Sequence, residues 1–178
     1  MHIPRIYIDT SVIGGCFDQQ FAYWSNELFN QIMKGTMIAI ISEITLKEIE
    51  DAPFYVKEKL LNIPEEFSEV LPENTEVEFL AEKYIEHQAI PPSCVEDDLH
   101  IAYSTIYNVD VLVSWNFKHI VNLNRIKGGS KNLDFVILAK AGMTVIRTTL
   151  KKFNSVNLFY GYKTVEIRSP KEVIDNEL

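Results

Sequence analysis

The chain has 178 residues, 47% of them hydrophobic, and a mean hydropathy of −0.02, which is the composition of one globular domain and excludes a disordered chain. Its two cysteines, Cys16 and Cys94, form no Cys-x-x-Cys pair, which argues against a disulfide scaffold or a zinc knuckle and favours a reducing cytoplasm. No apolar run is long enough to span a bilayer, so we expect a cytoplasmic protein without a membrane partner.

The formal net charge of −8 is unevenly distributed along the chain. Residues 1–117 carry 6 Lys and Arg against 20 Asp and Glu, a net of −14, whereas residues 118–178 carry 11 against 5, a net of +6. Such an asymmetry fits an anionic partner for the basic part. It equally fits a solvated surface with uneven charge, and charge alone leaves both interpretations open.

The first third of the chain alternates short apolar runs with segments of helical periodicity. Gly35 is placed to end one helix and Ser42 to cap the next, which stops at Pro53. The elements predicted here are a strand at 5–9, a helix at about 23–33, a strand at 36–41, a helix at 42–52 and another at 53–61.

The same alternation continues to the end of the chain. The predicted elements are a short strand or loop at 67–71, a helix from the cap residue Thr75 to about 88, a helix at 94–108, a strand at 109–115 and a strand at 163–170. Strands that alternate with helices predict a mainly parallel sheet of four to five strands, covered on both faces in a Rossmann-like three-layer α/β/α sandwich. We expect residues 1–178 to form a single domain.

Polar residues from four distant segments are predicted to meet at one edge of this sheet, because strand carboxyl ends and helix amino ends share an edge in a parallel α/β layer. Asp9 ends the first strand, and Asn116 follows the strand at 109–115. Asp97 and Asp98 lie in the first turns of the helix at 94–108, and Glu48 lies two turns into the helix at 42–52.

Each of these residues also has an ordinary structural explanation, such as a helix-dipole interaction, a solvated helix surface or a turn. Asp9 is harder to explain in this way, because a carboxylate beside a buried strand is costly unless something pairs with it. The flanking stretches "IDTSV", "VEDDLH" and "VSWNF" contain no Lys or Arg. Oxygen ligands without cysteine or a histidine pair favour a hard cation, Mg²⁺ or Mn²⁺, whose chemistry suits phosphodiester hydrolysis.

These motifs resemble those of the PIN-domain nucleases, most closely the VapC-like toxin ribonucleases of toxin–antitoxin pairs. The resemblance covers most of the chain and rests on the order of its motifs rather than on any one alone. The matching stretches are "YIDTSVIGG", "ISEITLKEIE", "EDDLHIAYST", "DVLVSWNFKHI" and "VNLFYGYKTVEIRSPKEVI". It implies a PIN-like fold and a metal-dependent endoribonuclease, the toxin of a VapBC-type pair.

The resemblance also assigns roles to individual residues. The catalytic and metal-binding positions that it implies are Asp9, Glu48, Asp97 and Asn116, with Asp98 as a further metal ligand. Asn116 departs from the family pattern, because an amide stands where an acid is common and one negative charge is lost. Hydrogen bonds to the ligands or their waters are expected from Thr10, Ser11 and Ser114.

The segment after Asn116 is basic and is expected to contact the RNA backbone through Lys118, His119, Arg125 and Lys127. His119 is also a candidate general acid, although a backbone contact or a plain surface role is favoured. His100 is predicted to be a packed or hydrogen-bonded helix residue rather than a catalyst. Residues 128–152 interrupt the family pattern and are interpreted as an insertion within the domain.

The resemblance implies three partners: an RNA substrate, a cognate antitoxin protein that blocks the acids, and a second copy of the chain in a homodimer. An alternative function is a catalytically weakened PIN-like module that binds RNA or protein. A weaker third option is a DNA-directed flap nuclease or a phosphatase-like hydrolase. The chain has neither an Asp-x-Asp-x-Thr nucleophile motif nor a glycine-rich phosphate loop.

Overall fold

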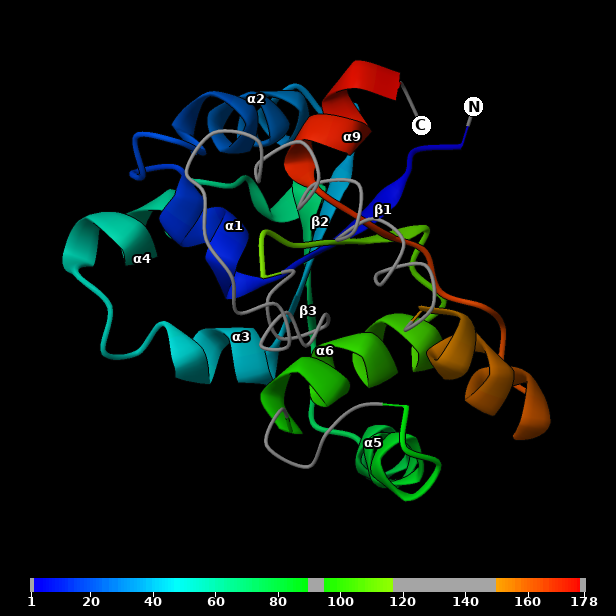
Figure 1. Ribbon diagram of the computed structural model, residues 1–178. Coiled ribbons are helices and arrows are strands. Elements are labelled where there is room, and N and C mark those ends of the chain that lie inside the picture. The colour runs from blue at the N-terminus through cyan, green and yellow to red at the C-terminus, as the bar shows by residue number, and fades with distance from the viewer. Residues whose placement is uncertain (1, 90–94, 117–149, 177–178) are drawn as a thin grey trace, which may run out of the picture.

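The computed structural model describes residues 2–89, 95–116 and 150–176, with a helix at 150–159 in the last of these ranges (Figure 1). The remaining elements are β1 (Arg5–Ile8), α1 (Thr10–Gly15), α2 (Ala22–Met33), β2 (Ile38–Ser42), α3 (Glu43–Glu48), α4 (Phe54–Leu61), a 3₁₀ turn (Glu65–Phe67), β3 (Ser68–Leu71), α5 (Thr75–Glu86), α6 (Val95–Ile106), β4 (Val111–Val113), β5 (Ile167–Arg168) and α9 (Pro170–Asn176).

The five strands form one sheet in the order β3-β2-β1-β4-β5, and every neighbouring pair is parallel. This arrangement confirms the predicted α/β fold class with its parallel sheet. From β1 the chain proceeds to β2 and β3 on one side and later to β4 and β5 on the other, so the strand order reverses between β1 and β4. Within the described ranges, no helix combines the length and apolar character needed to cross a membrane.

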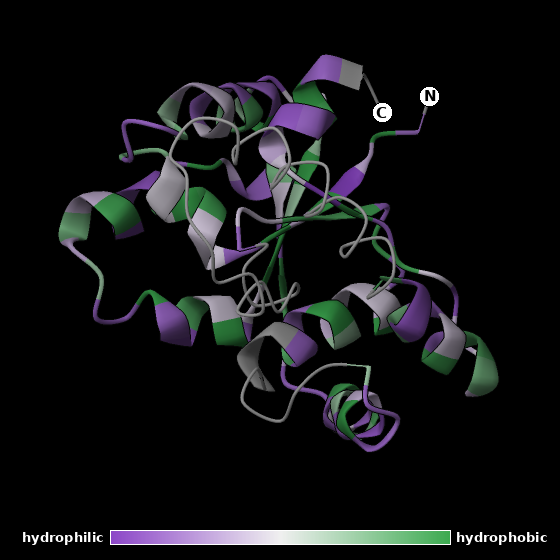
Figure 2. Ribbon diagram, in the orientation of Figure 1, coloured by the Kyte–Doolittle hydropathy of each residue, from purple (hydrophilic) through white to green (hydrophobic). Residues whose placement is uncertain are grey.

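Alternate side chains of the central strands enter two separate cores, one on each face of the sheet. Ile6 and Ile8 of β1 pack with α1, α2, α4 and α9, whereas Tyr7 between them packs with α5, α6 and the helix at 150–159. The period of two along a strand produces this division, so hydrophobic residues line both sides of the sheet. The central strands are accordingly coloured mostly as hydrophobic in Figure 2. The result is the three-layer sandwich that the alternating pattern predicts.

Several helix and strand ends differ from those predicted. Asn74, rather than Thr75, caps α5, because its side-chain oxygen accepts a hydrogen bond from the backbone N–H of Glu76 at 2.9 Å. Helix α3 ends at Glu48 rather than near Pro53, and β4 is limited to the three residues that pair with β1. The predicted cap by Ser42 is confirmed, and Gly35 takes the left-handed conformation (φ 71°) expected at a helix end.

The predicted insertion at 128–152 lies mostly outside the described residues. Its last three residues belong to the helix at 150–159, which packs through Phe153 and Val156 against the core under α5 and α6. In Figure 1 this helix lies beside the C-terminal part of α6, away from the carboxyl end of β1, where the candidate site lies.

Candidate active site

The strand register brings three polar residues to one level at the carboxyl edge of the sheet. Ile8 pairs with Val113 of β4, and Tyr7 pairs with Ile40 of β2. One residue beyond the pair of Ile8 and Val113, Asp9 therefore lies level with Ser114. Two residues beyond the pair of Tyr7 and Ile40, Asp9 lies level with Ser42. This edge, where the strand order reverses between β1 and β4, is the position at which open α/β sheets bind their ligands.

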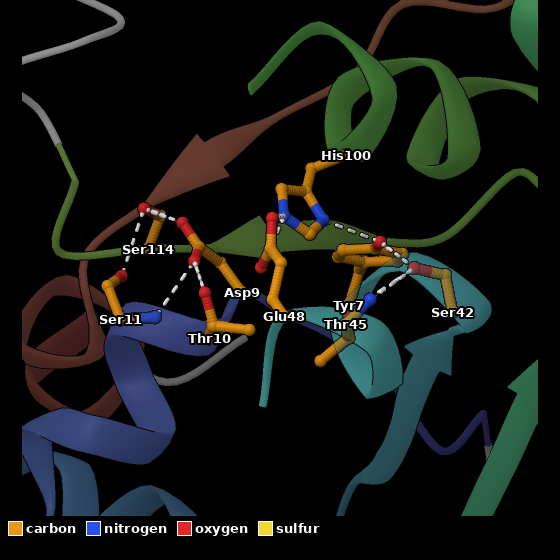
Figure 3. Close-up of polar contacts among 9 residues, drawn as sticks. All are labelled: Tyr7, Asp9, Thr10, Ser11, Ser42, Thr45, Glu48, His100 and Ser114. Atoms are coloured by element: carbon orange, nitrogen blue, oxygen red, sulfur yellow. Dashed lines mark hydrogen bonds and ion pairs between the residues drawn. The ribbon is translucent and has the colours of Figure 1, made fainter. Parts of the chain in front are cut away.

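Asp9 is almost fully buried, with 6% of its surface exposed, and its carboxylate is hydrogen-bonded on both oxygens. It is the N-cap of α1: its Oδ1 accepts from the backbone N–H of Ser11 at 2.9 Å and from the hydroxyl of Thr10 at 3.2 Å. The hydroxyl of Ser114 donates to Oδ2 (Figure 3). A carboxylate has about four acceptor positions, so about one remains on Oδ2 for a ligand.

The loop after β4 is tied to the start of α1 by two serines. The hydroxyl of Ser114 accepts a hydrogen bond from the backbone N–H of Asn116 at 2.8 Å, and that of Ser11 accepts from the backbone N–H of Trp115 at 2.9 Å. The two hydroxyl oxygens are 3.4 Å apart. Ser11 and Ser114 therefore hold the backbone of Asn116 close to Asp9.

Glu48, the last residue of α3, points toward the same region as Asp9, and its carboxylate contacts the imidazole of His100 (Figure 3). His100 Nε2 lies 3.1 Å and 3.2 Å from the two carboxylate oxygens. Partial burial alone would raise the pKa of the Glu48 carboxyl. The hydrogen bond from His100 and its charge, with a smaller effect of the nearby Thr10 hydroxyl, outweigh burial and lower the pKa below its usual range.

Thr10 lies close to both acids. Its side chain hydrogen-bonds Asp9 and is also among the groups that lower the pKa of Glu48. Both carboxylates also act on Tyr7: burial raises the pKa of the Tyr7 phenol, and the negative charges of Asp9 and Glu48 raise it further. Two carboxylates from distant segments therefore lie within the reach of the same neighbouring side chains.

Of the other two predicted acids, the structure describes the side chain of Asp98 but not that of Asp97. Asp97 lies in the first turn of α6, three residues before His100, and its side chain is outside the described part of the chain. Asp98 is fully buried, and its charge contributes to a raised pKa of Tyr84 in α5. The predicted RNA-contacting residues Lys118, His119, Arg125 and Lys127 lie outside the described residues.

The described side chains include no group of three or more His, Cys, Asp or Glu residues that could hold a metal ion. They present two carboxylates, Asp9 and Glu48, and the backbone of Asn116 is held beside Asp9 through Ser114. Mg²⁺ is commonly held by one or two carboxylates, with water and substrate phosphate oxygens completing its shell. The remaining acceptor position on Asp9 and the ionised state of Glu48 therefore fit a hard cation.

The sequence does not predict the contacts of His100 with Glu48 and Tyr7. A buried tyrosine needs a partner for its hydroxyl, which is the sequence signal that something polar must face Tyr7. The prediction that His100 is hydrogen-bonded is confirmed.

A scan of protein-family models and a search of curated proteins found no match. Among solved structures, the chain is similar to one from the crystal structure of VapBC2 from Rickettsia felis bound to a DNA fragment from their promoter. The two chains are 17% identical, with a TM-score of 0.46, and the match covers 64% of this chain and 89% of that one. We therefore infer function from this chain's own residues.

Proposed function

We propose that this protein is a Mg²⁺- or Mn²⁺-dependent endoribonuclease and the toxin of a VapBC-type toxin–antitoxin pair. The observation that carries the proposal is the pair Asp9 and Glu48. These carboxylates, from different elements, lie at the strand-order reversal, within reach of the same Thr10 side chain. Their positions agree with the two acids that the motif resemblance assigns to a nuclease site.

Several residues of the chain would act together at the cation site. Asp9, Glu48, Asp97 and Asn116 would hold the cation, with Asp98 as a further predicted ligand. When bound, the cation lowers the pKa of a water and polarises the phosphoryl oxygen. The hydroxyls of Thr10 and Ser114 keep the Asp9 carboxylate in one orientation, so its remaining acceptor position always points in the same direction.

The proposal also includes an RNA substrate and two protein partners. The basic residues Lys118, His119, Arg125 and Lys127 would contact the RNA backbone, in keeping with the net charge of +6 over residues 118–178. A cognate antitoxin that covers the acids, and a homodimer of this chain, are part of the same proposal.

The test is cleavage of RNA by the purified protein with Mg²⁺ or Mn²⁺, and by its Asp9→Asn and Glu48→Gln variants. Wild-type protein is expected to cleave, and both variants to lose activity while remaining folded. Variants that cleave as well as the wild type would show that these acids are not the site and would overturn the proposal. Titration calorimetry with Mn²⁺ measures the binding step separately.

One observation favours a second candidate, a non-catalytic PIN-like module that binds RNA or protein. Asp9 already accepts three hydrogen bonds from its own chain, and its role as the cap of α1 explains a buried carboxylate without any cation. This candidate predicts RNA retention without cleavage and no Mn²⁺ binding at millimolar concentration in a folded protein.

A further inference from the structure

A chain of buried polar side chains begins at Glu48 and returns to the start of the helix that carries it. We propose that Tyr7 and His100 are positioning residues that hold the Glu48 carboxylate in a single orientation for cation binding. The inference rests on the proposed function, because it assigns the residues that prepare one of its ligands. Neither residue is expected to touch the substrate.

Glu48 needs external support because its own helix gives it little. Helix α3 has six residues, Glu48 is the last of them, and Thr45 is its buried residue. A glutamate side chain loses a large conformational entropy when it is ordered, so a carboxylate at the end of a short helix samples many positions unless a neighbour binds it. A ligand that must be ordered when the cation arrives binds more weakly.

His100 is the neighbour that orders Glu48. Its ring is 4% exposed, and its Nε2 contacts both carboxylate oxygens, a geometry that fixes the position of the carboxylate. An ionised carboxylate only accepts hydrogen bonds, so Nε2 carries the proton. The second ring nitrogen, Nδ1, is hydrogen-bonded to the Tyr7 hydroxyl 2.8 Å away.

Tyr7 is in turn held by the residue that begins α3. The Tyr7 hydroxyl lies 2.6 Å from Oγ of Ser42, which caps α3 by accepting from the backbone N–H of Thr45 at 3.3 Å. The hydrogen bonds of His100, Tyr7 and Ser42 therefore form one continuous path from Glu48 to the cap of α3 (Figure 3). The network therefore joins the first and last turns of α3 through β1 and α6.

Tyr84 offers a matched control for Tyr7. Both tyrosines are fully buried, and both hydroxyls take part in polar networks. The Tyr84 hydroxyl donates to Asn157 at 2.6 Å and lies 3.3 Å from the hydroxyl of Thr105, on the side of α6 that faces the helix at 150–159. Replacing either tyrosine by phenylalanine removes one buried hydroxyl, but only Tyr7→Phe interrupts the connection to Glu48.

The experiment compares Tyr7→Phe with Tyr84→Phe in urea unfolding, Mn²⁺ calorimetry and steady-state RNA cleavage. Both variants are expected to fold with a similar modest loss of stability. Tyr7→Phe should weaken Mn²⁺ binding about 10-fold, as the loss of a partner that orients a ligand does, and lower kcat with little change in KM. Tyr84→Phe should keep wild-type Mn²⁺ affinity and kcat.

A second arm removes Glu48 itself. In a Glu48→Gln background, Tyr7→Phe should have no further effect on Mn²⁺ affinity, because the ligand that it orients is already changed. His100→Gln retains an N–H for Glu48 and should keep more affinity than His100→Ala. A metal-free readout is the ¹⁵N spectrum of the His100 ring, in which Tyr7→Phe should change the Nδ1 signal and Tyr84→Phe should not.

The outcomes separate the two proposals. If wild-type protein binds Mn²⁺ and Tyr7→Phe matches Tyr84→Phe in affinity and kcat, the positioning role is wrong and the proposed function stands. An equal effect of Tyr7→Phe with and without Glu48→Gln also overturns the positioning role. Wild-type protein that binds no Mn²⁺ and cleaves no RNA overturns the proposed function, and the positioning role with it.

Discussion

The hydroxyl of Ser114 donates a hydrogen bond to the carboxylate of Asp9, although 105 positions of sequence separate the two residues. The same hydroxyl accepts from the backbone N–H of Asn116. One oxygen atom, Oγ of Ser114, is therefore hydrogen-bonded both to the carboxylate at the end of β1 and to the loop after β4. The parallel register of β1 and β4 makes this contact possible by placing Asp9 and Ser114 at the same level.

Ser114→Ala is expected to destabilise the protein by about 1–3 kcal/mol, because the buried Asp9 carboxylate loses a hydrogen-bond donor. Urea unfolding measures the loss. Ser104→Ala is the control, since the Ser104 hydroxyl is equally buried but donates only to the carbonyl of His100 in its own helix. Its cost should be below about 0.5 kcal/mol. Equal losses of unfolding free energy in the two variants would show that the hydrogen bond from Ser114 to Asp9 stabilises the protein no more than the bond that Ser104 makes within its own helix.

Substitutions at Asp9 can separate its two roles. Asp9→Asn keeps an oxygen that caps α1, whereas Asp9→Ala removes the cap at a further cost of about 1 kcal/mol in the free energy of unfolding. Both variants remove the charge and should lower RNA cleavage by about 100-fold or more, since even outer-shell partners of a metal ligand are worth about 10–100-fold.

The matched control for Asp9 is Asp110→Asn, at the opposite end of the sheet, where Asp110 accepts from the backbone N–H of Arg5. This variant should retain wild-type cleavage. If Asp9→Asn also retains it, the carboxylate serves only as a helix cap. If both variants lose cleavage together, the assay reports folding rather than chemistry, which the unfolding curves would show directly.

Local pattern was sufficient to predict the layers of this fold. The apolar run at Ile38–Ser42 and the helical spacing in α5 and α6 depend on neighbours within a few residues, and the sequence displays them directly. The cap of α5 was assigned to the wrong residue because Asn74 and Thr75 are both good caps. The choice depends on backbone angles: Asn74 is extended and Thr75 is already helical.

The candidate site was predictable only in part, for a related physical reason. Asp9 could be placed because a strand visibly ends there, and Ser114 because it ends the parallel neighbour. The contact of Glu48 with His100 depends on the order of strands in the sheet and on the early end of α3. Neither property is encoded in a short stretch of residues, so the partner of Glu48 could not be read from the sequence.

Two adjacent glycines of α1 should respond in opposite directions to alanine. A Cβ on Gly15 would lie 2.7 Å from the hydroxyl of Ser25 and 2.9 Å from the ring of Trp115, whose Nε1 donates to that hydroxyl. Gly15→Ala should therefore break this bond, cost about 1–3 kcal/mol and displace the residue that precedes Asn116. A Cβ on Gly14 meets nothing, and Gly14→Ala should gain up to about 1 kcal/mol.

Chemical denaturation gives both free energies, and RNA cleavage tests the consequence for the site. Gly15→Ala is expected to cleave more slowly than the wild type even where it is fully folded, whereas Gly14→Ala should cleave at the wild-type rate. Equal stability of the two variants would mean that the contact between α1 and Trp115 adapts at no cost.

Tyr84 makes the stability of the protein sensitive to alkali. Burial raises the pKa of its phenol well above the usual value, the charge of Asp98 adds to the increase, and hydrogen bonds with Thr105 and Asn157 only partly oppose it. A group whose pKa is raised in the folded state contributes stability that is fully present below its unfolded pKa, near 10 for tyrosine. That stability is lost as pH rises above this value.

We therefore expect the free energy of unfolding to fall more steeply above pH 10 in the wild type than in Tyr84→Phe. The difference in slope should approach about 1.4 kcal/mol per pH unit, the linkage limit for one proton. Urea unfolding at a series of pH values measures the slope, and ultraviolet absorbance reports tyrosinate formation. Tyr23→Phe, at a side chain that is 70% exposed, is the control and should keep the wild-type slope. Identical slopes in all three proteins would show that the Tyr84 phenol ionises without unfolding the chain.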